Sequence, residues 1–511
     1  MKRRVGWIWG LIFGVSLAWM ASGAAAAPKG KVVLGLAGEP VTFDPSTTTG
    51  FPMAQLWPLV FDSLLDRDYT GRIVPGLATS WRWVTPTLLE LKLREGVKFS
   101  NGEPVDAHAV KFSFDRIFDP ELKSQVRTLM KSIERAEVVD AHTVRLHTKT
   151  PDTFLVPVLA DWSFVIPPEY YRSHDSKHLA RNPVGSGPYR LVRWKKSEEM
   201  VFEANPGYWN PDKQRVKTGV VKFISETTTR ASALLAGTVD IVDAMQPQLA
   251  PMIKANPKLE AVTGPGAKTC FVVMVIKEGA PWLKPGVRKA LNYAVDKESI
   301  VKNVLEGYGQ TALGTLVSPA SYGHTPGLKP YPYDPALAKK MLAEAGHPNG
   351  FEVEMFVPHG RYLKGTEAAE ALGGQLEKVG IQVRVRTIEY GAWRRNSEAR
   401  WQPHVKPFWS YVCRNDLPLH ASYMYEGAIH GKSLHGGVRD KTLDKLVDEA
   451  LAETDDDKRL KKYQDLNRTI REMAPLIFLY HLDQITGKKK DLGWKMRANE
   501  AVLLSETWWK D

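Results

Sequence analysis

The chain has 511 residues, of which 43 % are hydrophobic and 25 % charged, and its formal net charge is +12 at pH 7. This length exceeds what a single hydrophobic core usually supports, so we expect an ordinary soluble globular protein of two or three domains. The basic balance does not indicate a nucleic-acid partner, because the lysines and arginines are dispersed and the longest run beyond the N-terminus is Lys488-Lys489-Lys490.

Residues 1–27 are predicted to be a secretory signal peptide. Its three parts are a basic start, Met1 to Arg4, an apolar run, Val5 to Met20, and small residues from Ala21 to Ala27. A retained membrane anchor is the alternative, but the apolar run is short for a bilayer and ends without a charged stop. Neither cysteine lies directly behind this segment, so we do not expect a lipid anchor. We therefore expect an exported, periplasmic protein.

The mature chain opens with a strand-like segment, Lys31 to Leu36. Glu39-Pro40 and Asp44-Pro45 then lead into a polar loop, and an apolar segment follows from Leu56 to Leu65. The turn-rich stretch that follows, Gly71 to Trp81, separates this segment from the next strand pattern. These patterns indicate an α/β protein and carry no chemistry of their own.

The stretch from Leu88 to Arg116 combines a strand pattern, a turn, a helix cap and a helix. Apolar and charged residues alternate as far as Phe99, which is the period of strands with one buried face and predicts a hairpin broken at Glu95-Gly96. Asn101-Gly102 turns the chain, and Asp106 is expected to cap a helix. The apolar positions of that helix are Val110, Phe114, Ile117 and Phe118.

The segment Gly185-Ser186-Gly187 predicts a tight reversal at a crossover between domains, because glycine reaches the φ angles that such turns require. It is not a phosphate loop, since no Lys-Ser or Lys-Thr follows at the required spacing. Ser186 also lacks the outer glycines of a hydrolase nucleophile elbow. A short helix, Arg230 to Leu235, and a strand, Val239 to Ile241, come next.

The chain has two cysteines, Cys270 and Cys413. Cys270 lies in the apolar run Thr269 to Ile276, which predicts a fully buried strand, and Cys413 is expected in a loop. Two separate thiols, at least one of them buried, are therefore the favoured interpretation. The oxidising periplasm keeps a disulfide as the less favoured alternative.

Helix and strand signals are clear in the C-terminal half. Asp296 and Asp334 are expected to cap helices, the second with Pro335 at its first position and Gly346 beyond its end. A strand, a helix and a strand then follow with a short return, which predicts a parallel βαβ unit. The predicted elements are strands at Phe351 to Val357, Ile381 to Val385 and Pro475 to Tyr480, and helices at Val287 to Val295, Thr366 to Val379, Leu443 to Ala450 and Tyr463 to Ile470.

Several of these segments together resemble the family 5 extracellular solute-binding proteins, the dipeptide and oligopeptide receptors of bacterial ABC importers. The strongest match is LREGVKFSNGEPVDAHAVKFSFDR, Leu93 to Arg116, and the second is VRKALNYAVDKESIV, Val287 to Val301. Shorter matches are the turn Asn182 to Tyr189 and the segment Ala474 to Tyr480. The resemblance covers essentially all of the mature chain.

The resemblance implies the periplasmic-binding-protein type II fold, an α/β fold with two lobes, a hinge and an extra inserted domain. Two linking strands would form the hinge, one near Thr263 to Cys270 and one near Ala474. A lobe that the chain leaves and re-enters can close on a ligand through few backbone changes. The implied domains are a discontinuous domain I at 28–53, 184–270 and 474–511, domain II at 54–183, and domain III at 271–473.

The family places its ligand between the lobes, and Arg361 matches the arginine that holds the peptide carboxylate in dipeptide-binding members. A planar guanidinium suits that role because it pairs both carboxylate oxygens at once. Arg361 and its neighbour Tyr362 follow a predicted strand, whose end faces the crevice in open α/β sheets. Phe51, at the end of the polar loop that runs into the family's cleft, is also expected to contact the ligand.

A second site segment surrounds Trp409, which we also expect to contact the ligand. Peptide-binding relatives carry "W-x-x-D" here, and the aspartate pairs with the peptide's amino group. In this chain the spacing places Val412 at that position, and Asp416 is the nearby carboxylate. Either Asp416 takes the role through a shifted loop, or the ligand lacks a free α-amine. Arg414 would favour an anionic or strongly polar ligand if it points inward; a surface position is its alternative.

We expect no cofactor and no metal site, because the sequence has neither His-Glu-x-x-His nor Cys-x-x-Cys. His420, His430 and His435 could hold a metal chelate, although loop histidines exposed to water are the favoured interpretation. The acidic run Asp455-Asp456-Asp457 is typical of a helix N-terminus.

The expected function is therefore that of a monomeric periplasmic receptor that is not an enzyme. It would capture a peptide or similar small organic solute and deliver it to the membrane permease of an ABC importer. Peptide, opine-like conjugate, glycoside and metal chelate all stay open as ligands. A secreted hydrolase with an unrecognised active site is the alternative function.

Overall fold

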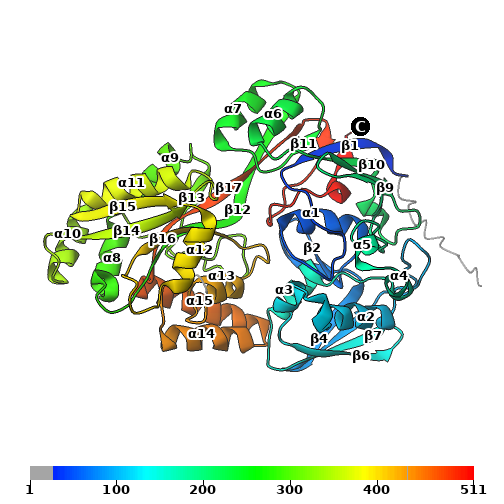
Figure 1. The fold of residues 1–511 in the computed structure, drawn as a ribbon, viewed down its shortest axis with the longest axis horizontal. Helices are drawn as coiled ribbons and strands as arrows, with labels where there is room; N and C mark the ends of the chain where they lie inside the picture. Colours follow the sequence, from blue (N-terminus) through cyan, green and yellow to red (C-terminus); the bar gives the residue numbers. More distant parts are fainter. Residues whose placement is uncertain (1–26, 434–435, 511) are drawn as a thin grey trace, which may run out of the picture.

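The computed structural model describes residues 27–433 and 436–510, so the predicted signal peptide lies outside the described residues except for Ala27. Two lobes lie side by side and are joined by two long strands, β12 (Leu259–Met274) and β17 (Leu476–Lys489) (Figure 1). The first lobe contains the elements before β12 together with the C-terminal segment, and the second lobe contains those between β12 and β17. Within the described ranges no helix is both long and apolar enough for a membrane span.

One mixed sheet of eleven strands extends through both lobes, in the order β15-β14-β16-β12-β17-β11-β1-β10-β9-β8, with β13 added beside β17. The first-lobe strands are β1 (Lys29–Leu36), β8 (Tyr189–Lys195), β9 (Glu199–Ala204), β10 (Val216–Phe223) and β11 (Ile241–Val242). The second-lobe strands are β13 (Gly309–Thr311), β14 (Phe351–Pro358), β15 (Ile381–Ile388) and β16 (Trp409–Asn415). This arrangement is the predicted α/β fold with two lobes.

Strands β12 and β17 are the two chain connections between the lobes. They pair antiparallel, and their register is interrupted between Pro265 and Lys268, at the boundary of the lobes. Such an irregularity bends a strand locally, so it is suited to a hinge. The linking strands predicted near Thr263 to Cys270 and near Ala474 correspond to β12 and β17, and the residues of β17 opposite the irregularity are Leu482 and Asp483. The exact domain boundaries stay predictions.

The first lobe also contains a four-stranded antiparallel sheet in the order β4-β5-β7-β6. These strands are β4 (Ala78–Thr85), β5 (Leu88–Leu93), β6 (Ile133–Asp140) and β7 (Thr143–Thr148), and helix α2 (Ala107–Phe118) accompanies them (Figure 1). The predicted hairpin broken at Glu95-Gly96 is wrong, because β5 pairs with β4 and β7 and the chain leaves the sheet after it. Alternation reports a half-buried face and does not identify the partner strand.

The predicted helix starts are confirmed by their caps. The Asp106 carboxylate accepts a hydrogen bond from the amide of Ala109 at 2.9 Å, and Asp296 and Asp334 cap their helices in the same way. Asp455 caps α15, so the acidic run is a helix N-terminus as expected. The predicted helices are observed as α6 (Thr227–Leu235), α8 (Pro285–Tyr293), α9 (Lys297–Asn303), α10 (Pro335–Glu344), α11 (Gly365–Glu377), α14 (Lys441–Ala452) and α15 (Asp456–Met473).

The predicted βαβ unit is β14, α11 and β15, with the two strands parallel and in register from Phe351–Ile381 to Pro358–Ile388. Further short elements lie beside it and in the first lobe. They are α1 (Phe51–Val60), β2 (Leu65–Arg67), β3 (Ile73–Pro75), α3 (Leu155–Trp162), α4 (Pro168–Ser173), α5 (Ser176–Leu179), α7 (Ala250–Ala255), α12 (Tyr390–Ala399) and α13 (Ala421–Ala428).

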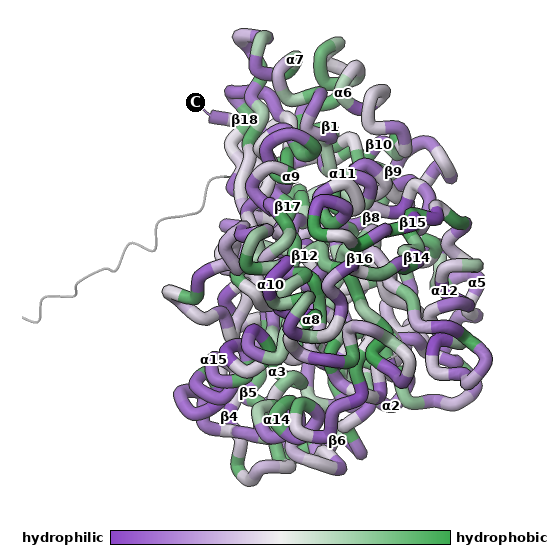
Figure 2. The backbone as a smooth tube through the Cα atoms, turned by 90° about the vertical axis from the view of Figure 1, so that its left-hand side faces the viewer, coloured by the Kyte–Doolittle hydropathy of each residue, from purple (hydrophilic) through white to green (hydrophobic). Residues whose placement is uncertain are grey.

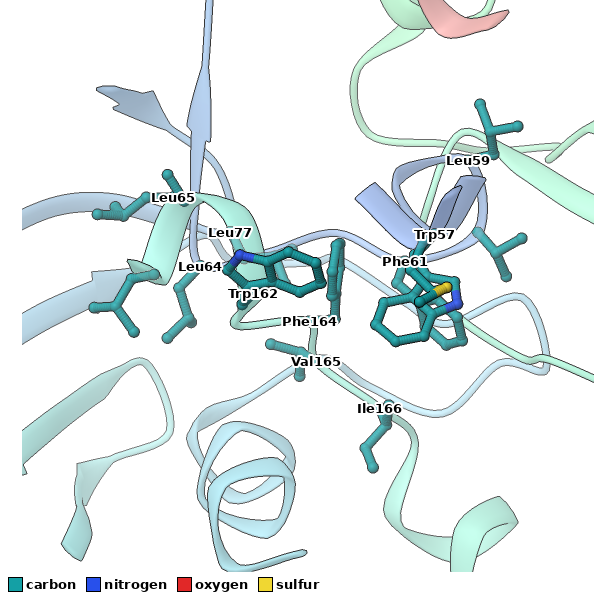
Figure 3. Packing of buried hydrophobic residues seen from close by; sticks show 14 of the residues in the cluster. Trp57, Leu59, Phe61, Leu64, Leu65, Leu77, Trp162, Phe164, Val165 and Ile166 are labelled. Atoms are coloured by element: carbon teal, nitrogen blue, oxygen red, sulfur yellow. The ribbon is translucent and has the colours of Figure 1, made fainter. Parts of the chain in front are cut away.

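Each lobe has its own hydrophobic core. One cluster spans most of the first lobe, and two clusters lie in the second. Figure 2 shows hydrophilic segments at the periphery and hydrophobic ones mostly toward the interior. In the first lobe the Trp57 ring meets Trp162 and Phe164 edge to face, with centroids 6.2 and 5.8 Å apart (Figure 3). Many of the tryptophans therefore fill cores and are not exposed for stacking on ligands.

The glycines of Gly185-Ser186-Gly187 are required for a different reason from the predicted one. Neither glycine has a positive φ. A Cβ atom at Gly185 would lie 2.1 Å from the carbonyl oxygen of Val60, and one at Gly187 would lie 2.5 Å from its carbonyl carbon. Close approach of two backbones, and not a left-handed turn, therefore explains these glycines.

The expectation of two separate thiols is wrong, because Cys270 and Cys413 form a disulfide. The two residues lie directly opposite each other on the adjacent antiparallel strands β12 and β16. Cys413 therefore lies within β16, which continues to Asn415, and not in the predicted loop. The bond links a hinge strand to the sheet of the second lobe.

Candidate functional site

A cavity of about 990 Å³ lies between the two lobes. Its walls come from α1 and the segments around α6 on the first lobe, and from the β14–α11 connection and the end of β16 on the second. Hinge residues 482–486 of β17, with Lys268 of β12, form the remaining side. A concave interlobe space of this size suits a small organic ligand.

Arg361 lines this cavity from the second lobe. It follows β14 directly, after Gly360, whose φ of 62° turns the chain at the strand end. The guanidinium lies 5.0 Å from the centre of the Tyr390 ring and makes no ion pair with a carboxylate of the described residues. An exposed cation without an opposing charge is therefore available on the cavity wall.

Tyr362 and Phe51 also line the cavity, from opposite lobes. Tyr362 packs against Tyr411, with ring centroids 6.0 Å apart. Burial raises the pKa of its phenol to about 12, so the hydroxyl stays protonated and can donate a hydrogen bond. Phe51 begins α1 on the facing lobe and supplies an apolar surface.

The other predicted site residues lie away from this cavity. Trp409 is fully buried in the second-lobe core, with its ring centroid 5.4 Å from that of Trp282. Arg414 donates a hydrogen bond to the carbonyl of Tyr423 and lies 4.3 Å from that ring. Asp416 is 1 % exposed and accepts a hydrogen bond from the amide of His420.

The burial of Asp416 has an electrostatic consequence. Desolvation raises the pKa of its carboxyl group to about 6, and hydrogen bonds and Arg414 offset this only in part. A carboxylate in this position supports the local turn rather than the cavity wall. The structure thus brings together Arg361, Tyr362 and Phe51, and it does not bring Trp409, Arg414 or Asp416 to them.

Two ion pairs in the cavity were not anticipated. Arg230 and Asp243 are both buried, with 3.5 Å between Nε and Oδ1, and Asp243 also accepts a hydrogen bond from Gln55. Lys268 on β12 pairs with Glu500 of the C-terminal segment. Lys268 and Glu500 are 232 residues apart, so no local pattern could have predicted their pairing. Their charges are mutually neutralised.

Asp483 is the other functional candidate that the sequence analysis missed. It lies on β17 in the cavity wall, and its Oδ1 atom is buried without a hydrogen-bond partner in the described part of the chain. Burial raises the pKa of this carboxyl group. The available signal was the polar pair Asp483-Gln484, which follows the largely apolar run Leu476 to Leu482.

The lobes also touch each other away from this cavity. The Thr153 hydroxyl donates a hydrogen bond to the carbonyl of Leu451 at 2.7 Å, across the interface. Nearby, the Phe154 ring of the first lobe packs against His420 and Tyr423 of the second. A further cavity of about 940 Å³, lined in part by Trp81, Trp83, Tyr322 and Arg459, lies on this side of the interface.

This contact leads to a prediction about lobe closure. Thr153→Val keeps the side-chain shape and removes the hydroxyl donor, so we expect a two- to tenfold weaker ligand affinity, roughly the net value of one hydrogen bond. Isothermal titration calorimetry measures the affinity, and small-angle scattering measures the compactness. Thr128→Val, which changes an exposed threonine bonded only within its own turn, is the control. Unchanged affinity together with unchanged compactness would show that the contact does not stabilise the closed arrangement.

The expectation of water-exposed loop histidines is wrong for two of the three residues. His420 and His430 are 4 % and 5 % exposed, and His435 lies outside the described residues. His420 stacks on Tyr322, and burial lowers the pKa of its imidazole well below the usual value, so the ring is neutral. In the described ranges no group of three His, Cys, Asp or Glu side chains is arranged to hold a metal ion.

Residues 72–411 match a family model described as bacterial extracellular solute-binding proteins, family 5 middle. Glutathione-binding protein GsiB of Escherichia coli K12 is 28 % identical over 493 residues, which covers 94 % of each chain. Among solved structures, HbpA2 from Haemophilus parasuis is 22 % identical, with a TM-score of 0.84, over 94 % of this chain and 100 % of that one. AgaA of A. tumefaciens R10 in complex with agropinic acid is 25 % identical, with a TM-score of 0.73, over 94 % and 99 %.

Proposed function

This chain belongs to the bacterial extracellular solute-binding proteins of family 5, and from that premise we propose how it captures and delivers its ligand. It is the substrate-binding component of an ABC importer and holds a peptide or similar small organic solute in the cavity between its lobes. The membrane permease of the importer then receives the solute. The periplasmic-binding-protein type II fold supplies the two lobes that this task requires.

The cavity with its free cation is the observation that carries this proposal. Arg361 stands at a strand end, exposed to about 990 Å³ of space between lobes and without a carboxylate partner in the described chain. We propose that it binds the ligand's carboxylate, with Tyr362 and Phe51 contacting the remainder. A guanidinium fork pairs both carboxylate oxygens, which fixes orientation as well as affinity.

The ligands named for two relatives are compatible with this role. Glutathione, for GsiB, and agropinic acid, bound to AgaA, are both organic acids. We infer a ligand of the same general kind here, with at least one carboxylate. Trp409, Arg414 and Asp416 would then act indirectly, as packing and turn residues beneath the second-lobe wall.

Closure about β12 and β17 would enclose the solute. Within the described residues only two strands cross between the lobes, and an irregular register interrupts their pairing. A rotation there changes few backbone angles, so the lobes can move as rigid bodies. We propose that the protein does this as a monomer in the periplasm, after export through the predicted signal peptide.

A catalytic role is not part of this proposal, since the family consists of receptors. Ser186, the serine considered for a hydrolase, is 1 % exposed and donates its hydroxyl hydrogen bond to the Asp62 carboxylate at 3.0 Å. No histidine takes part in that contact. Ser186 therefore does not provide a nucleophile for the secreted-hydrolase alternative.

The proposal is tested by binding without turnover. Small peptides and glutathione are added to purified protein, and we expect at least one to raise the melting temperature and to be recovered chemically intact. Small-angle scattering of the same sample should show a more compact particle at saturation. Conversion of a bound compound to a product would contradict the receptor role, and an unchanged radius at saturation would contradict closure.

A further inference from the structure

The hinge side of the interlobe cavity carries hydrogen-bond acceptors without donors. The buried Oδ1 atom of Asp483 has no hydrogen-bond partner in the described chain, and the same holds for the Oδ1 atom of Asn415. Both residues line the cavity. A buried acceptor left unsatisfied costs about 1–3 kcal/mol, so two of them in one cavity indicate a surface built to receive donors.

The strand pairing places Asn415 and Asp483 on the two strands that flank Lys268. The charge of Lys268 is already neutralised by an ion pair. Asn415 on β16 lies opposite Lys268 on β12, and Lys268 lies opposite Leu482, the neighbour of Asp483 on β17. The Lys268 ammonium is bound to Glu500. Asp483 is therefore left as a carboxylate without an opposing charge in the described chain. Burial alone raises the pKa of Asp483, and no cation offsets this.

The unpaired cation of the same cavity, Arg361, lies several strands away from Asp483. Arg361 follows β14, and the strands β14, β16, β12 and β17 are neighbours in that order. At about 4.8 Å per strand step, β14 and β17 are separated by about 14 Å. A cation and a carboxylate, each without an ion-pair partner in the described chain, thus line the same cavity from strands about 14 Å apart.

From this juxtaposition we propose that Asp483 binds a positively charged amino group of the ligand. Arg361 binds the ligand's carboxylate at the other end, so the substrate class is a zwitterion, a short peptide or amino-acid conjugate with a free amine. Asn415 accepts a further hydrogen bond from the same ligand. This assignment rests on the proposed receptor function and narrows its ligand.

The proposal also resolves a difficulty raised by the sequence. The position expected to carry the amine-binding aspartate holds Val412, and Asp416 is buried and does not line the cavity. An ammonium taken out of water needs a carboxylate to compensate its lost hydration. Asp483 supplies that carboxylate from the hinge strand. A shifted loop around Asp416 is then unnecessary.

The test uses two solute pools with wild-type protein, Asp483→Asn and the control Asp491→Asn, which changes an exposed carboxylate in the turn after β17. One pool is a casein digest of short peptides, and the other is the same digest treated with acetic anhydride to acetylate its amines. Mass spectrometry quantifies what each protein retains after gel filtration. Wild-type protein and Asp491→Asn should retain free-amine peptides about 10- to 100-fold better than Asp483→Asn does. All three should retain the acetylated peptides equally poorly.

Each remaining outcome counts against the proposal in a distinguishable way. Equal retention of free-amine peptides by Asp483→Asn and wild type would overturn the role of Asp483 and leave the receptor function intact. Equal retention of both pools by wild-type protein would overturn amine recognition. Retention of neither pool would contradict the peptide-like ligand, and the zwitterion assignment would fall with it.

A measurement without ligand checks that the variant reports binding and not misfolding. Because Asp483 is an unpaired carboxylate in a partly desolvated position, neutralising it should raise the melting temperature of the free protein. A purely structural aspartate would give the opposite sign. A lower melting temperature for Asp483→Asn than for Asp491→Asn would therefore contradict a carboxylate held in readiness for a ligand.

Discussion

Replacing Arg361 with alanine is expected to weaken binding of carboxylate-bearing ligands about 100-fold, while neutral analogues lose at most about threefold. Removing one partner of a desolvated charge pair costs about 2–5 kcal/mol, much of it from the charge left without a partner. A neutral analogue, such as the C-terminal amide of the same peptide, has no carboxylate that the substitution would leave without a partner. Isothermal titration calorimetry with an acid and its amide measures both effects.

The matched control for this experiment is Arg384→Ala. Arg384 lies on β15 of the same lobe and pairs with Glu352 on the exposed side of the sheet, away from the cavity. It should leave both affinities unchanged, because exposed ion pairs contribute little. Equal losses for acid and amide in Arg361→Ala would mean that the side chain acts by packing against Tyr390 and not by binding a carboxylate.

Removing the disulfide is expected to lower the free energy of unfolding by about 3–5 kcal/mol. The bond joins residues separated by 143 positions, and a cross-link that closes so long a loop restricts the unfolded chain strongly. Cys270 is fully buried, so serine at that position also places a hydroxyl in an apolar site. Denaturant unfolding of the Cys270→Ser, Cys413→Ser double variant measures the loss.

Reductant provides the control for the disulfide prediction. Dithiothreitol should destabilise the wild-type protein toward the level of the double variant and leave the double variant unchanged. A second double variant with alanine at both positions lacks the disulfide and also the buried hydroxyl. Comparing it with the serine variant separates the effect of the lost cross-link from the effect of the hydroxyl. Two titratable thiols in the untreated, unfolded protein would contradict the bond.

Local chemistry explains which parts of the fold were predictable. Asp106, Asp296 and Asp334 each bond the amide three residues ahead, so the information for the helix start lies within four residues of sequence. The βαβ unit was similarly predictable, because its periodicities and short returns leave few arrangements. Arg361 was found through a motif at a strand end, and the tertiary structure places it on the cavity.

The missed features depend on strand pairing. The prediction of a hairpin at Glu95-Gly96 was wrong because the alternation of apolar and charged residues does not indicate which strand is adjacent. The pairing of Cys270 with Cys413 requires knowing that β12 lies beside β16. Asp416 carries the expected charge near the expected motif, yet the turn after β16 buries it.

The sequence by itself determined the family, the two-lobed fold and the helix starts capped by aspartates, since each is encoded in motifs whose residues are close along the chain. Only the tertiary structure decided which charges remain free. Lys268 and Asp483 both face the cavity, and the sequence does not distinguish them. Lys268 meets Glu500 from the C-terminal segment, whereas Asp483 meets no cation in the described chain. Neutralisation depends on distance in space, and strands that come from remote parts of the chain set that distance.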